Sequence, residues 1–495
     1  MLDWILYGIG NVFEWHIILA MIFGVAAGIV IGALPGLSAT MGVALMLPLT
    51  FGMPPTAGML LLIGIYCGGI YAGSVSAILL KTPGTAASAA TVEDGFALAQ
   101  QGKAHTALNL SIYASVAGGL ISGFALLFFA PQIAKVALGF GPPEYFMLAL
   151  FGLTIISSVS GNSISKGLIM GCLGVLVSTV GLDPITGGER FIFNTTFLLS
   201  GIDLVPALIG LFAISEVFNQ IAKGSKSIAS GATLKKEKFS IKDFLSLKKV
   251  IAKSSIIGVI VGAIPGTGGT ISAFISYNEA KRSSKKPEEF GKGSYEGIVA
   301  SESSNNGTTG ATLIPMMTLG IPGDVVTAVL LGGLMIQGLT PGPQLFTENA
   351  DIVYTIMVGF ILVNIIMLIL AKMAIPWFAK ITSIPSNVLM PIVLVLCLIG
   401  SYAVNNSLSS VGIAIFFGVI GYFLPKYGYS VTPMLIAIIL GPLAEKSLRQ
   451  SLILSDGSFM IFFQRPISIL FLVFCLLSVF VPLLAKYKER RKQNI

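Results

Sequence analysis

Four Pro-Gly pairs interrupt the apolar segments of this chain. Their sequences are IGALPGLSAT at Ile31–Thr40, KTPGT at Lys81–Thr85, VGAIPGTGGT at Val261–Thr270 and GIPGD at Gly320–Asp324. Proline removes a backbone donor and glycine permits left-handed backbone, so these residues end helices. Within a bilayer, broken helices are tolerated only where they line a cavity. In a membrane-spanning chain, the four breaks therefore predict the position of a binding cavity.

The hydrophobic content indicates that the chain does span a membrane. Hydrophobic residues make up 54% of the 495 residues and charged residues 11%, whereas soluble domains carry about 25% charged residues. Uncharged runs long enough to cross a bilayer recur, among them Ile17–Ala33, Leu108–Ala130, Ile352–Leu370 and Pro466–Leu484. We therefore predict an all-α polytopic membrane protein with roughly 10–13 membrane segments.

The charges indicate the orientation in the membrane. Asn219–Lys253 is a lysine-rich polar interruption near the middle, and the tail after Leu484 is also basic, whereas the leader before Ile17 has Asp3 and Glu14 but no Lys or Arg. Basic segments favour the cytoplasm, so we expect the linker and the C-terminus inside and the N-terminus outside. The net charge of +8 lies mostly beside apolar runs and does not indicate nucleic-acid binding.

Two pairs of segments match at a nearly constant shift along the chain. Val261–Thr270 matches Ile31–Thr40, and Ala311–Thr327 matches Ala72–Ser88 at a slightly larger shift. With a cytoplasmic linker, the first half crosses the membrane an odd number of times, so the repeats are expected to be inverted. The predicted organisation is a first repeat at 1–220, a basic cytoplasmic linker at 221–253, a second, inverted repeat at 254–458, and an extra transmembrane helix with a basic cytoplasmic tail at 459–495.

Basic residues flank both ends of the segment Ser255–Tyr277, which has Pro265 and Gly266 at its centre. Both ends would then be cytoplasmic, and each arm of about eleven residues would span roughly 16 Å, half of a membrane. This pattern predicts a re-entrant hairpin, with a counterpart around Pro35 that enters from outside. The alternative is one kinked helix that spans the membrane.

The predicted substrate- or ion-binding residues lie at the breaks and in the polar run SESSNNGTT at Ser301–Thr309. Helix N-termini favour anions, whereas carbonyl, amide and hydroxyl oxygens suit hard cations such as Na⁺. A Na⁺ site is predicted near Asn305, Asn306 and Asp324. The alternative for the polar run is a surface loop that caps the next helix. The candidates are Pro35, Gly36, Ser38, Thr40, Lys81, Thr82, Pro83, Gly84, Thr85, Gly266, Thr267, Gly268, Thr270, Ser304, Asn305, Asn306, Thr308, Pro322, Gly323 and Asp324.

Two of these candidates are charged, and charges at membrane depth are usually functional. Lys81 lies two residues before Pro83, and Asp324 lies two residues after Pro322. In the favoured interpretation, Lys81 binds a substrate carboxylate and Asp324 binds Na⁺ or a proton near the same cavity. The alternatives are a structural or gating salt bridge between them, and side chains that reach the membrane interface.

Three long stretches resemble the large membrane subunit of the tripartite tricarboxylate transporter family (TctA-like). These are Gly32–Pro55, Tyr71–Leu108 and Phe290–Phe346, which begins FGKGSYEGIVASESSNNGTTG. The resemblance implies a secondary transporter of the bacterial cytoplasmic membrane that takes up citrate-like or other carboxylates, driven by a Na⁺ or H⁺ gradient. It also implies two partners, a small membrane subunit (TctB-like) and an extracytoplasmic solute-binding protein (TctC-like). Family members commonly have Asn at the position of Lys81.

The residues themselves exclude some other functions. The chain lacks the phosphate-loop pattern G-x-x-x-x-G-K-[ST], so we expect no NTP hydrolysis. The acidic residues are scattered and no H-E-x-x-H or D-x-x-D pattern occurs, so we expect neither an enzyme nor a cofactor. An ion or solute channel and a polytopic membrane enzyme are the alternative classes. Saturable flux that depends on a gradient would distinguish a transporter from a channel.

Overall fold

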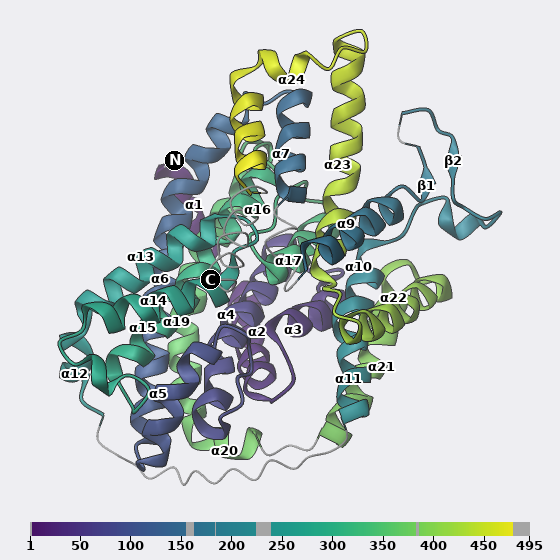
Figure 1. The fold of residues 1–495 in the computed structure, drawn as a ribbon. Coiled ribbons are helices and arrows are strands. Elements are labelled where there is room, and N and C mark those ends of the chain that lie inside the picture. The colour runs from purple at the N-terminus through teal and green to yellow at the C-terminus, as the bar shows by residue number, and fades with distance from the viewer. Residues whose placement is uncertain (1, 155–162, 184, 224–238, 383–385, 479–495) are drawn as a thin grey trace, which may run out of the picture.

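The computed structural model of the chain describes residues 2–154, 163–183, 185–223, 239–382 and 386–478. Helices dominate these residues (Figure 1). The first half contains α1 (Leu2–Asn11), α2 (Trp15–Ala33), α3 (Ala39–Met46), α4 (Pro55–Leu80), α5 (Ala89–Gln100), α6 (Ala104–Ala137), α7 (Pro142–Thr154), α9 (Ile164–Ser178), α10 (Leu204–Leu208) and α11 (Ser215–Lys223). Strands β1 (Gly181–Leu182) and β2 (Glu189–Arg190) form an antiparallel pair in which Gly181 is opposite Arg190.

The second half contains a similar series of helices. These are α12 (Ile241–Ser246), α13 (Lys248–Ala263), α14 (Gly268–Ser283), α15 (Tyr295–Ala311), α16 (Leu313–Leu319), α17 (Val325–Ile336), α18 (Leu345–Glu348), α19 (Ala350–Ala374), α20 (Phe378–Ile381), α21 (Ser386–Asn405), α22 (Leu408–Lys426), α23 (Thr432–Leu454) and α24 (Ile461–Gln464). Short 3-10 turns are η1 (Leu47–Thr50), η2 (Thr196–Leu198), η4 (Pro287–Glu289) and η5 (Ile375–Trp377), and the π-helical turn η3 (Ile209–Ile214) joins α10 to α11.

Six helices within the described residues are long and apolar enough to cross a membrane. They are Trp15–Ala33, Pro55–Leu80, Ala104–Ala137, Leu204–Lys223, Ala350–Trp377 and Leu408–Lys426. Shorter apolar helices accompany them, including Pro466–Ser478 in the predicted extra C-terminal helix. The prediction of an all-α polytopic membrane protein is confirmed. Part of the predicted linker (224–238) and the end of the chain (479–495) lie outside the described residues.

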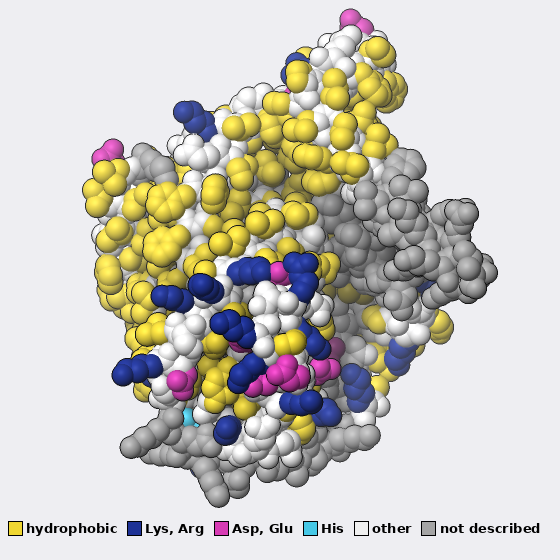
Figure 2. Space-filling view, turned by 60° about the vertical axis from the view of Figure 1, so that its left-hand side comes forward, with side chains coloured by type: hydrophobic (Ala, Val, Ile, Leu, Met, Phe, Trp, Pro, Cys, Tyr) yellow, Lys and Arg dark blue, Asp and Glu magenta, His cyan; other side chains and the backbone are white. Residues whose placement is uncertain are grey.

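The surface has a broad hydrophobic face. In Figure 2 this face lies above a zone in which lysine, arginine, aspartate and glutamate gather. Large apolar side chains are exposed on outer helices, for example Phe128 and Phe129 of α6 and Ile256 and Ile260 of α13. Such a continuous apolar surface is unfavourable in water and is suited to contact with lipid.

Corresponding helices of the two halves make corresponding contacts. Helix α4 of the first half packs against α19 of the second half, and α15 of the second half packs in the same way against α6 of the first half. Farther along the chain, α9 packs against α23, while α22 packs against the helix formed by α10, η3 and α11. This reciprocal exchange is the arrangement expected of two repeats related by a twofold axis. The predicted boundaries at residues 220, 254 and 458 remain predictions.

Glycines allow one pair of helices in each half, α2 with α4 and α13 with α15, to approach closely. A Cβ atom on Gly28 of α2 would lie 2.5 Å from the carbonyl oxygen of Ile65 on α4. Gly258 of α13 has the same role in the second half, because its Cβ would lie 2.5 Å from the carbonyl oxygen of Ser304 on α15. Gly258 is the counterpart of Gly28 when Val261–Thr270 is aligned with Ile31–Thr40. These small residues let backbones meet, as in other membrane helix pairs.

The segment around Pro265 forms two helices joined by a turn, rather than one kinked helix. Helices α13 and α14 have 16 residues each and pack against one another, with Ile264–Thr267 between them. The arms are longer than predicted because the polar ends, such as Lys248–Ser254, continue the helices. The side from which this hairpin enters the membrane remains a prediction.

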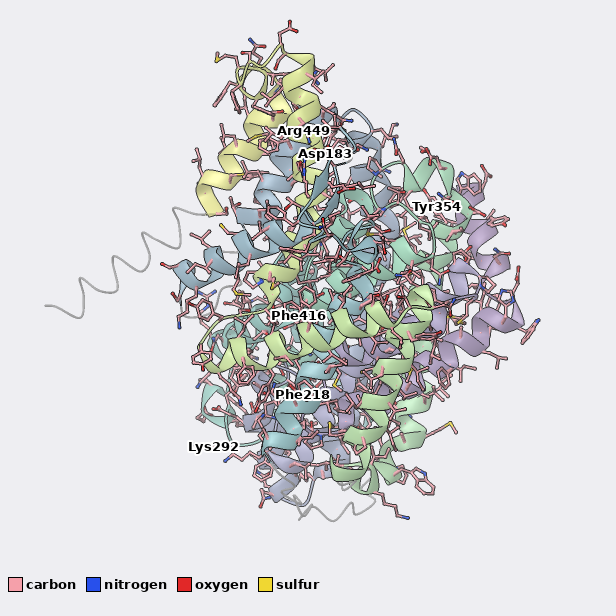
Figure 3. All side chains as sticks on the ribbon, turned by 90° about the vertical axis from the view of Figure 1, so that its right-hand side faces the viewer. Asp183, Phe218, Lys292, Tyr354, Phe416 and Arg449 are labelled. Carbon is pink, nitrogen blue, oxygen red and sulfur yellow. The ribbon has the colours of Figure 1, made fainter. Side chains whose placement is uncertain are left out.

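Ion pairs connect the β1–β2 hairpin to α23. The Asp183 carboxylate accepts hydrogen bonds from Arg449 at 2.7 Å and from Arg190, and Arg190 also pairs with Glu445 at 2.7 Å. Asp183 and Arg449 lie close together in Figure 3. Backbone N–H donors of the turn, led by Thr186, and the Arg449 guanidinium lower the pKa of Asp183 well below its usual value. The carboxylate is therefore stabilised in its charged form.

We expect Asp183→Asn to release this hairpin at neutral pH. Because the native pKa is lowered, the contribution of the charge is complete above the unfolded value of about 3.9 and is lost only as pH falls through the lower native value. Hydrogen exchange of residues 181–190 should accelerate severalfold in the variant, whereas the unmodified protein should keep its protection at pH 4 (about the unfolded pKa). Glu189→Gln, in the same hairpin, is the control. Equal exchange in both variants would show that the charge does not hold the hairpin.

Candidate functional site

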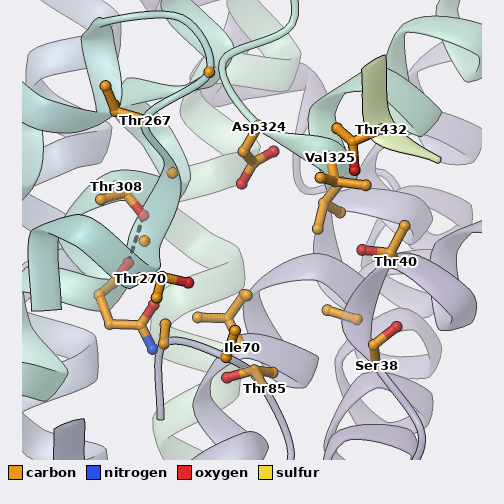
Figure 4. A pocket seen from close by; sticks show the side chains of 18 of the residues that line it. Ser38, Thr40, Ile70, Thr85, Thr267, Thr270, Thr308, Asp324, Val325 and Thr432 are labelled. Atoms are coloured by element: carbon orange, nitrogen blue, oxygen red, sulfur yellow. Dashed lines mark hydrogen bonds between the residues drawn. The ribbon is translucent and has the colours of Figure 1, made fainter. Parts of the chain in front are cut away.

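Residues from all four Pro-Gly motifs meet around one cavity of about 340 Å³. Two of the breaks are also joined directly, because the Gly266 N–H donates to the carbonyl oxygen of Gly323 at 2.8 Å. This volume is within the range of small-molecule sites. Figure 4 shows the cavity, with polar side chains converging from both halves of the chain. It is lined by Ser38, Ala39, Thr40, Ile70, Thr85, Ala86, Ala87, Gly266, Thr267, Gly268, Gly269, Thr270, Asn305, Thr308, Pro322, Asp324, Val325, Val326, Thr432 and Ile436.

Several helices begin at the wall of this cavity. Ala39 begins α3, Gly268 begins α14, Val325 begins α17 and Thr432 begins α23, and all four residues line the cavity. The first four N–H groups of a helix have no intrahelical partner, and the helix dipole makes this end positive. Four such ends around one space create a site that favours a negatively charged group.

Asn305 contributes uncommitted polar atoms to the same cavity. It is 1% exposed, and neither its Oδ1 nor its Nδ2 atom has a hydrogen-bond partner within the described residues. A buried amide without partners is unfavourable, so its presence indicates a ligand. The Nδ2 group can donate to a carboxylate, and Oδ1 can coordinate a cation. Thr308, one helical turn later, donates its hydroxyl to the carbonyl oxygen of Asn305 at 2.6 Å.

Asp324 places a carboxylate at the cavity wall. Its Oδ1 accepts a hydrogen bond from the N–H of Thr327 at 2.7 Å and caps α17, while Oδ2 accepts from the hydroxyl of Tyr66 at 2.7 Å. Tyr66 in turn lies 3.1 Å from the Thr312 hydroxyl. Asp324 forms no ion pair within the described residues, so a cation or a proton could neutralise it there.

The structure places the predicted residues in two cavities or outside both. In the main cavity lie Ser38, Thr40, Thr85, Gly266, Thr267, Gly268, Thr270, Asn305, Thr308, Pro322 and Asp324. A second cavity of about 270 Å³, which shares Ser38, is lined by Gly36, Pro83 and Gly84. The remaining predicted residues line neither of these two cavities: Pro35, Lys81, Thr82, Ser304, Asn306 and Gly323.

The polar run Ser301–Thr309 is buried helix in the middle of α15 and is not a surface loop. Consecutive residues of this run face different neighbours. Asn305 faces the cavity, whereas Ser304 pairs with the Ser272 hydroxyl of α14, and Asn306 donates to the Ser115 hydroxyl of α6 at 2.8 Å. The predicted Na⁺ site therefore retains Asn305 and Asp324 on the cavity wall, and Asn306 lies outside it.

Comparison with known proteins identifies the chain. The family model described as the tripartite tricarboxylate transporter TctA family matches residues 18–436. The chain belongs to the tripartite tricarboxylate transporter TctA family. This confirms the resemblance predicted from the sequence, and it makes the chain a multi-pass membrane subunit of a tripartite transporter.

Two relatives of this TctA-family chain come from Agrobacterium vitis. One, named "Uncharacterized 52.8 kDa protein in TAR-I ttuC' 3'region", is 36% identical over 94% of this chain and 93% of its own length. The other, "Uncharacterized protein in TAR-II ttuC' 3'region", is 35% identical over 48% of this chain and 98% of its own length. No solved structure matches the chain significantly.

The two second breaks of the TctA-family chain have matching caps. Asp324 and Thr327 exchange side-chain-to-backbone hydrogen bonds at the start of α17, and Thr85 and Ser88 do the same before α5. When Ala311–Thr327 is aligned with Ala72–Ser88, Asp324 thus corresponds to Thr85. Of the two predicted cavity charges, Asp324 lines the cavity and Lys81 does not.

Lys81 occupies the position that corresponds to Gly320. Both residues end a helix in the left-handed conformation, with φ of 59° at Lys81 and 70° at Gly320. The Lys81 side chain is exposed, and its Nζ lies 5.6 Å from the centre of the Phe96 ring. The expected placement of Lys81 near the same cavity as Asp324 is not what the structure shows, because Lys81 does not line that cavity and its exposed side chain lies over Phe96.

We therefore expect Lys81→Gly to preserve uptake and to stabilise the fold. Glycine adopts the left-handed conformation without the penalty of a Cβ atom, which for other residues is about 1 kcal/mol. The measurements are the thermal unfolding midpoint and the concentration dependence of uptake. Lys81→Ala is the control, because it removes the charge and keeps the strained Cβ. Weaker substrate affinity in both variants would show that the charge acts on the substrate.

Sequence reasoning missed some lining residues. Thr432 and Ile436 come from α23, far along the chain from the last break, and no Pro-Gly motif marks them. The available signal was Pro433, because proline favours the first turn of a helix and so marks a helix N-terminus. Tyr66 was also missed, since it lies in the uninterrupted apolar helix α4 and reaches the site only through Asp324.

Proposed function

We propose that this chain is the large permease subunit of a binding-protein-dependent transporter that takes up a tricarboxylate or related carboxylate by secondary active, ion-coupled transport. The observation that carries the proposal is the convergence of four helix N-termini on one cavity. Main-chain N–H groups and helix dipoles can bind a carboxylate without a fixed positive side chain. Broken helices from two repeats around one site are typical of secondary transporters.

The cation is proposed to bind on the same wall as the substrate. Asp324 and the Oδ1 atom of Asn305 supply oxygen ligands, and released carbonyl groups of the breaks can complete a shell for Na⁺. A carboxylate at the wall would repel an anionic substrate unless a cation or a proton neutralised it. Occupation by Na⁺ or H⁺ would therefore favour substrate binding, which is the basis of symport. No further cofactor is proposed.

The proposed partners are an extracytoplasmic solute-binding protein (TctC-like), which delivers the substrate, and a small membrane subunit (TctB-like). The proposed location is the bacterial cytoplasmic membrane, with the C-terminus in the cytoplasm. Membership of a tripartite transporter family supports both partners. The basic linker and tail support the orientation.

Uptake of labelled carboxylates into proteoliposomes tests the proposal. Vesicles would hold this chain with its small subunit, and the binding protein would be added outside. A panel of mono-, di- and tricarboxylates would be offered with a Na⁺ gradient, a pH gradient, both or neither. We expect saturable accumulation that requires a gradient. Equilibration without accumulation would indicate a channel, and the absence of flux for every carboxylate would refute the substrate class.

A further inference from the structure

A second carboxylate, outside the cavity, is sealed inside the protein. Glu302 on α15 is 0% exposed. Its Oε1 atom lies 2.5 Å from the Thr91 hydroxyl of α5, and its Oε2 atom lies 3.1 Å from the Ser115 hydroxyl and 3.4 Å from the Ser111 hydroxyl of α6. Within the described residues, Glu302 forms no ion pair with Lys, Arg or His. An unpaired charge in such a place is strongly disfavoured.

The ionisable groups on the surrounding helices leave Glu302 without a counter-charge. Tyr71 of α4 is close enough to interact electrostatically, and its hydroxyl has no hydrogen-bond partner within the described residues. Helix α16 has no ionisable residue. Other ionisable groups on these helices are paired elsewhere: Tyr66 with Asp324, Asp94 with Tyr277, His105 with Asn109, Tyr113 with Lys372, and Lys253 and Arg282 with Glu279. The remaining ones on these helices are Cys67, Glu93, Lys135, Lys248, Lys249 and Lys281.

On the side of Glu302 that faces α5, the hydroxyl groups of Ser301 and Thr91 have two protons for three hydrogen-bond links. Ser301 directs its hydroxyl to the carbonyl oxygens of Gly297 and Ile298, at 3.0 and 3.1 Å. When the Ser301 proton serves these carbonyl groups, Ser301 accepts the 2.8 Å bond from Thr91, which uses the single proton of Thr91. The 2.5 Å link between Thr91 and Glu302 is then completed by a proton of the carboxyl group.

The α6 side shows the same shortage. Ser74 directs its hydroxyl to the carbonyl oxygen of Tyr71 at 2.7 Å and so accepts from Ser111 at 2.6 Å. Ser111 then has no proton left for Glu302, and this contact is long at 3.4 Å. Ser115 differs, because it accepts from the amide of Asn306 and can donate its own proton to Oε2.

We propose that Glu302 is a proton-binding site, in which the carboxyl group donates from Oε1 to Thr91 and accepts at Oε2 from Ser115. A neutral carboxyl group supplies the proton of the Thr91 link, and the neutral form removes the cost of a buried charge. Loss of the proton leaves a buried carboxylate that only neutral hydroxyl groups contact, with no cationic partner among the described residues.

The position of Glu302 connects this proton to the substrate cavity. Glu302 precedes Asn305 by three residues on α15, about 4.5 Å along the helix axis. Asn305 faces the cavity. The next residue, Asn306, donates a hydrogen bond to the Ser115 hydroxyl, which also contacts Glu302. Negative charge in the cavity would favour protonation of Glu302, so the site can couple proton uptake to substrate binding. This coupling step rests on the proposed function, whereas protonation itself does not.

Infrared difference spectroscopy of the purified protein in lipid tests protonation without transport. A pH titration should show the carbonyl stretch of a buried protonated carboxyl group, and Glu302→Gln should remove this band. Glutamine preserves the size of the side chain and can still donate to Thr91. Glu93→Gln, at an exposed position on α5, is the control and should leave the band unchanged. A band that persists in Glu302→Gln, or is absent at every pH in the unmodified protein, would overturn the proposal.

Two neighbours should shift the titration in opposite directions. Thr91→Val removes the acceptor of the carboxyl proton, so the midpoint should move to lower pH. Ser115→Ala removes the donor to the carboxylate, so the midpoint should move to higher pH. Each lost hydrogen bond corresponds to a shift of about one pH unit. Shifts of the same sign would contradict the assigned roles.

Transport separates this inference from the proposed function. Glu302→Gln should keep substrate binding and Na⁺ dependence, and should lose the response of uptake to a pH gradient. If no carboxylate is transported by any variant, the proposed function fails and the infrared result still decides the proton site. A Glu302→Gln variant that loses Na⁺ dependence instead, with no carboxyl band in the unmodified protein, would assign the site to Na⁺ and refute the proton.

Discussion

Asp324→Asn should abolish the dependence of uptake on the ion gradient and lower the rate about tenfold to a hundredfold. The variant removes a charge that would bind the coupling ion, and charged hydrogen-bonding groups contribute about 1.5–3 kcal/mol, which corresponds to this range. Asparagine is an equally good helix cap, and its Oδ1 can still accept from the N–H of Thr327. The fold should therefore be preserved. The measurement is initial uptake in proteoliposomes with each gradient imposed separately.

Two further variants show whether the charge or the cap is responsible. Thr327→Val breaks the reciprocal cap of α17 and keeps the charge, so it should reduce stability and retain gradient dependence. Asp351→Asn changes an acidic residue in the first turn of α19, outside the cavity, and should behave like the unmodified protein. If Asp324→Asn keeps full gradient dependence, the coupling ion does not bind at Asp324.

Gly323→Ala should destroy the site by forcing two breaks apart. A Cβ atom on Gly323 would lie 2.6 Å from the Cα and Cβ atoms of Thr312, closer than real contacts allow. The break must then move, and the hydrogen bond from Gly266 to the carbonyl oxygen of Gly323 would be lost. We expect a lower thermal unfolding midpoint and at least about a tenfold loss of uptake, since overpacking typically costs about 1–3 kcal/mol.

The first half of the chain offers a matched test. Gly84 is the counterpart of Gly323 in the repeat alignment, and its Cβ would lie 2.6 Å from the carbonyl oxygen of Gly32 and 2.8 Å from the Cα of Gly73. Gly84→Ala should therefore have a similar effect. Gly412→Ala in α22, whose new Cβ would have no atom within 4 Å apart from the adjoining residues and backbone of its own helix, is the control and should be neutral or slightly stabilising. Normal uptake by Gly323→Ala would show that the two breaks need not touch.

Features that depend on local sequence were predictable. Long uncharged runs predict membrane helices, because a bilayer requires about 20 apolar residues for each crossing. Proline and glycine act on their own backbone, so the helix ends near Pro35, Pro83, Pro265 and Pro322 follow from the sequence. The repeated order of the motifs also indicated two related halves, and the matching helix contacts agree with that order.

Other features depend on how distant segments pack. The sequence placed Lys81 and Asp324 beside equivalent prolines, but in the structure Lys81 ends α4 with an exposed side chain, whereas Asp324 caps α17 at the cavity wall. Asn305 and Asn306 are neighbours with identical chemistry, and only the packing of α6 and α14 against α15 separates their roles. In the sequence Glu302 is one of several scattered acidic residues. Only the structure shows that hydroxyl groups of α5 and α6 surround it.

The membrane fold, the family and the positions of the four breaks could be read from the sequence, because each of them follows from a contiguous run of residues. Only the folded chain shows that the breaks share one cavity, that Thr432 of α23 completes its wall, and that Glu302 has no counter-charge among the described residues. A cavity or a buried charge is defined by the atoms that surround it. Those atoms come from helices that lie far apart in the chain, and no local pattern records which of them meet.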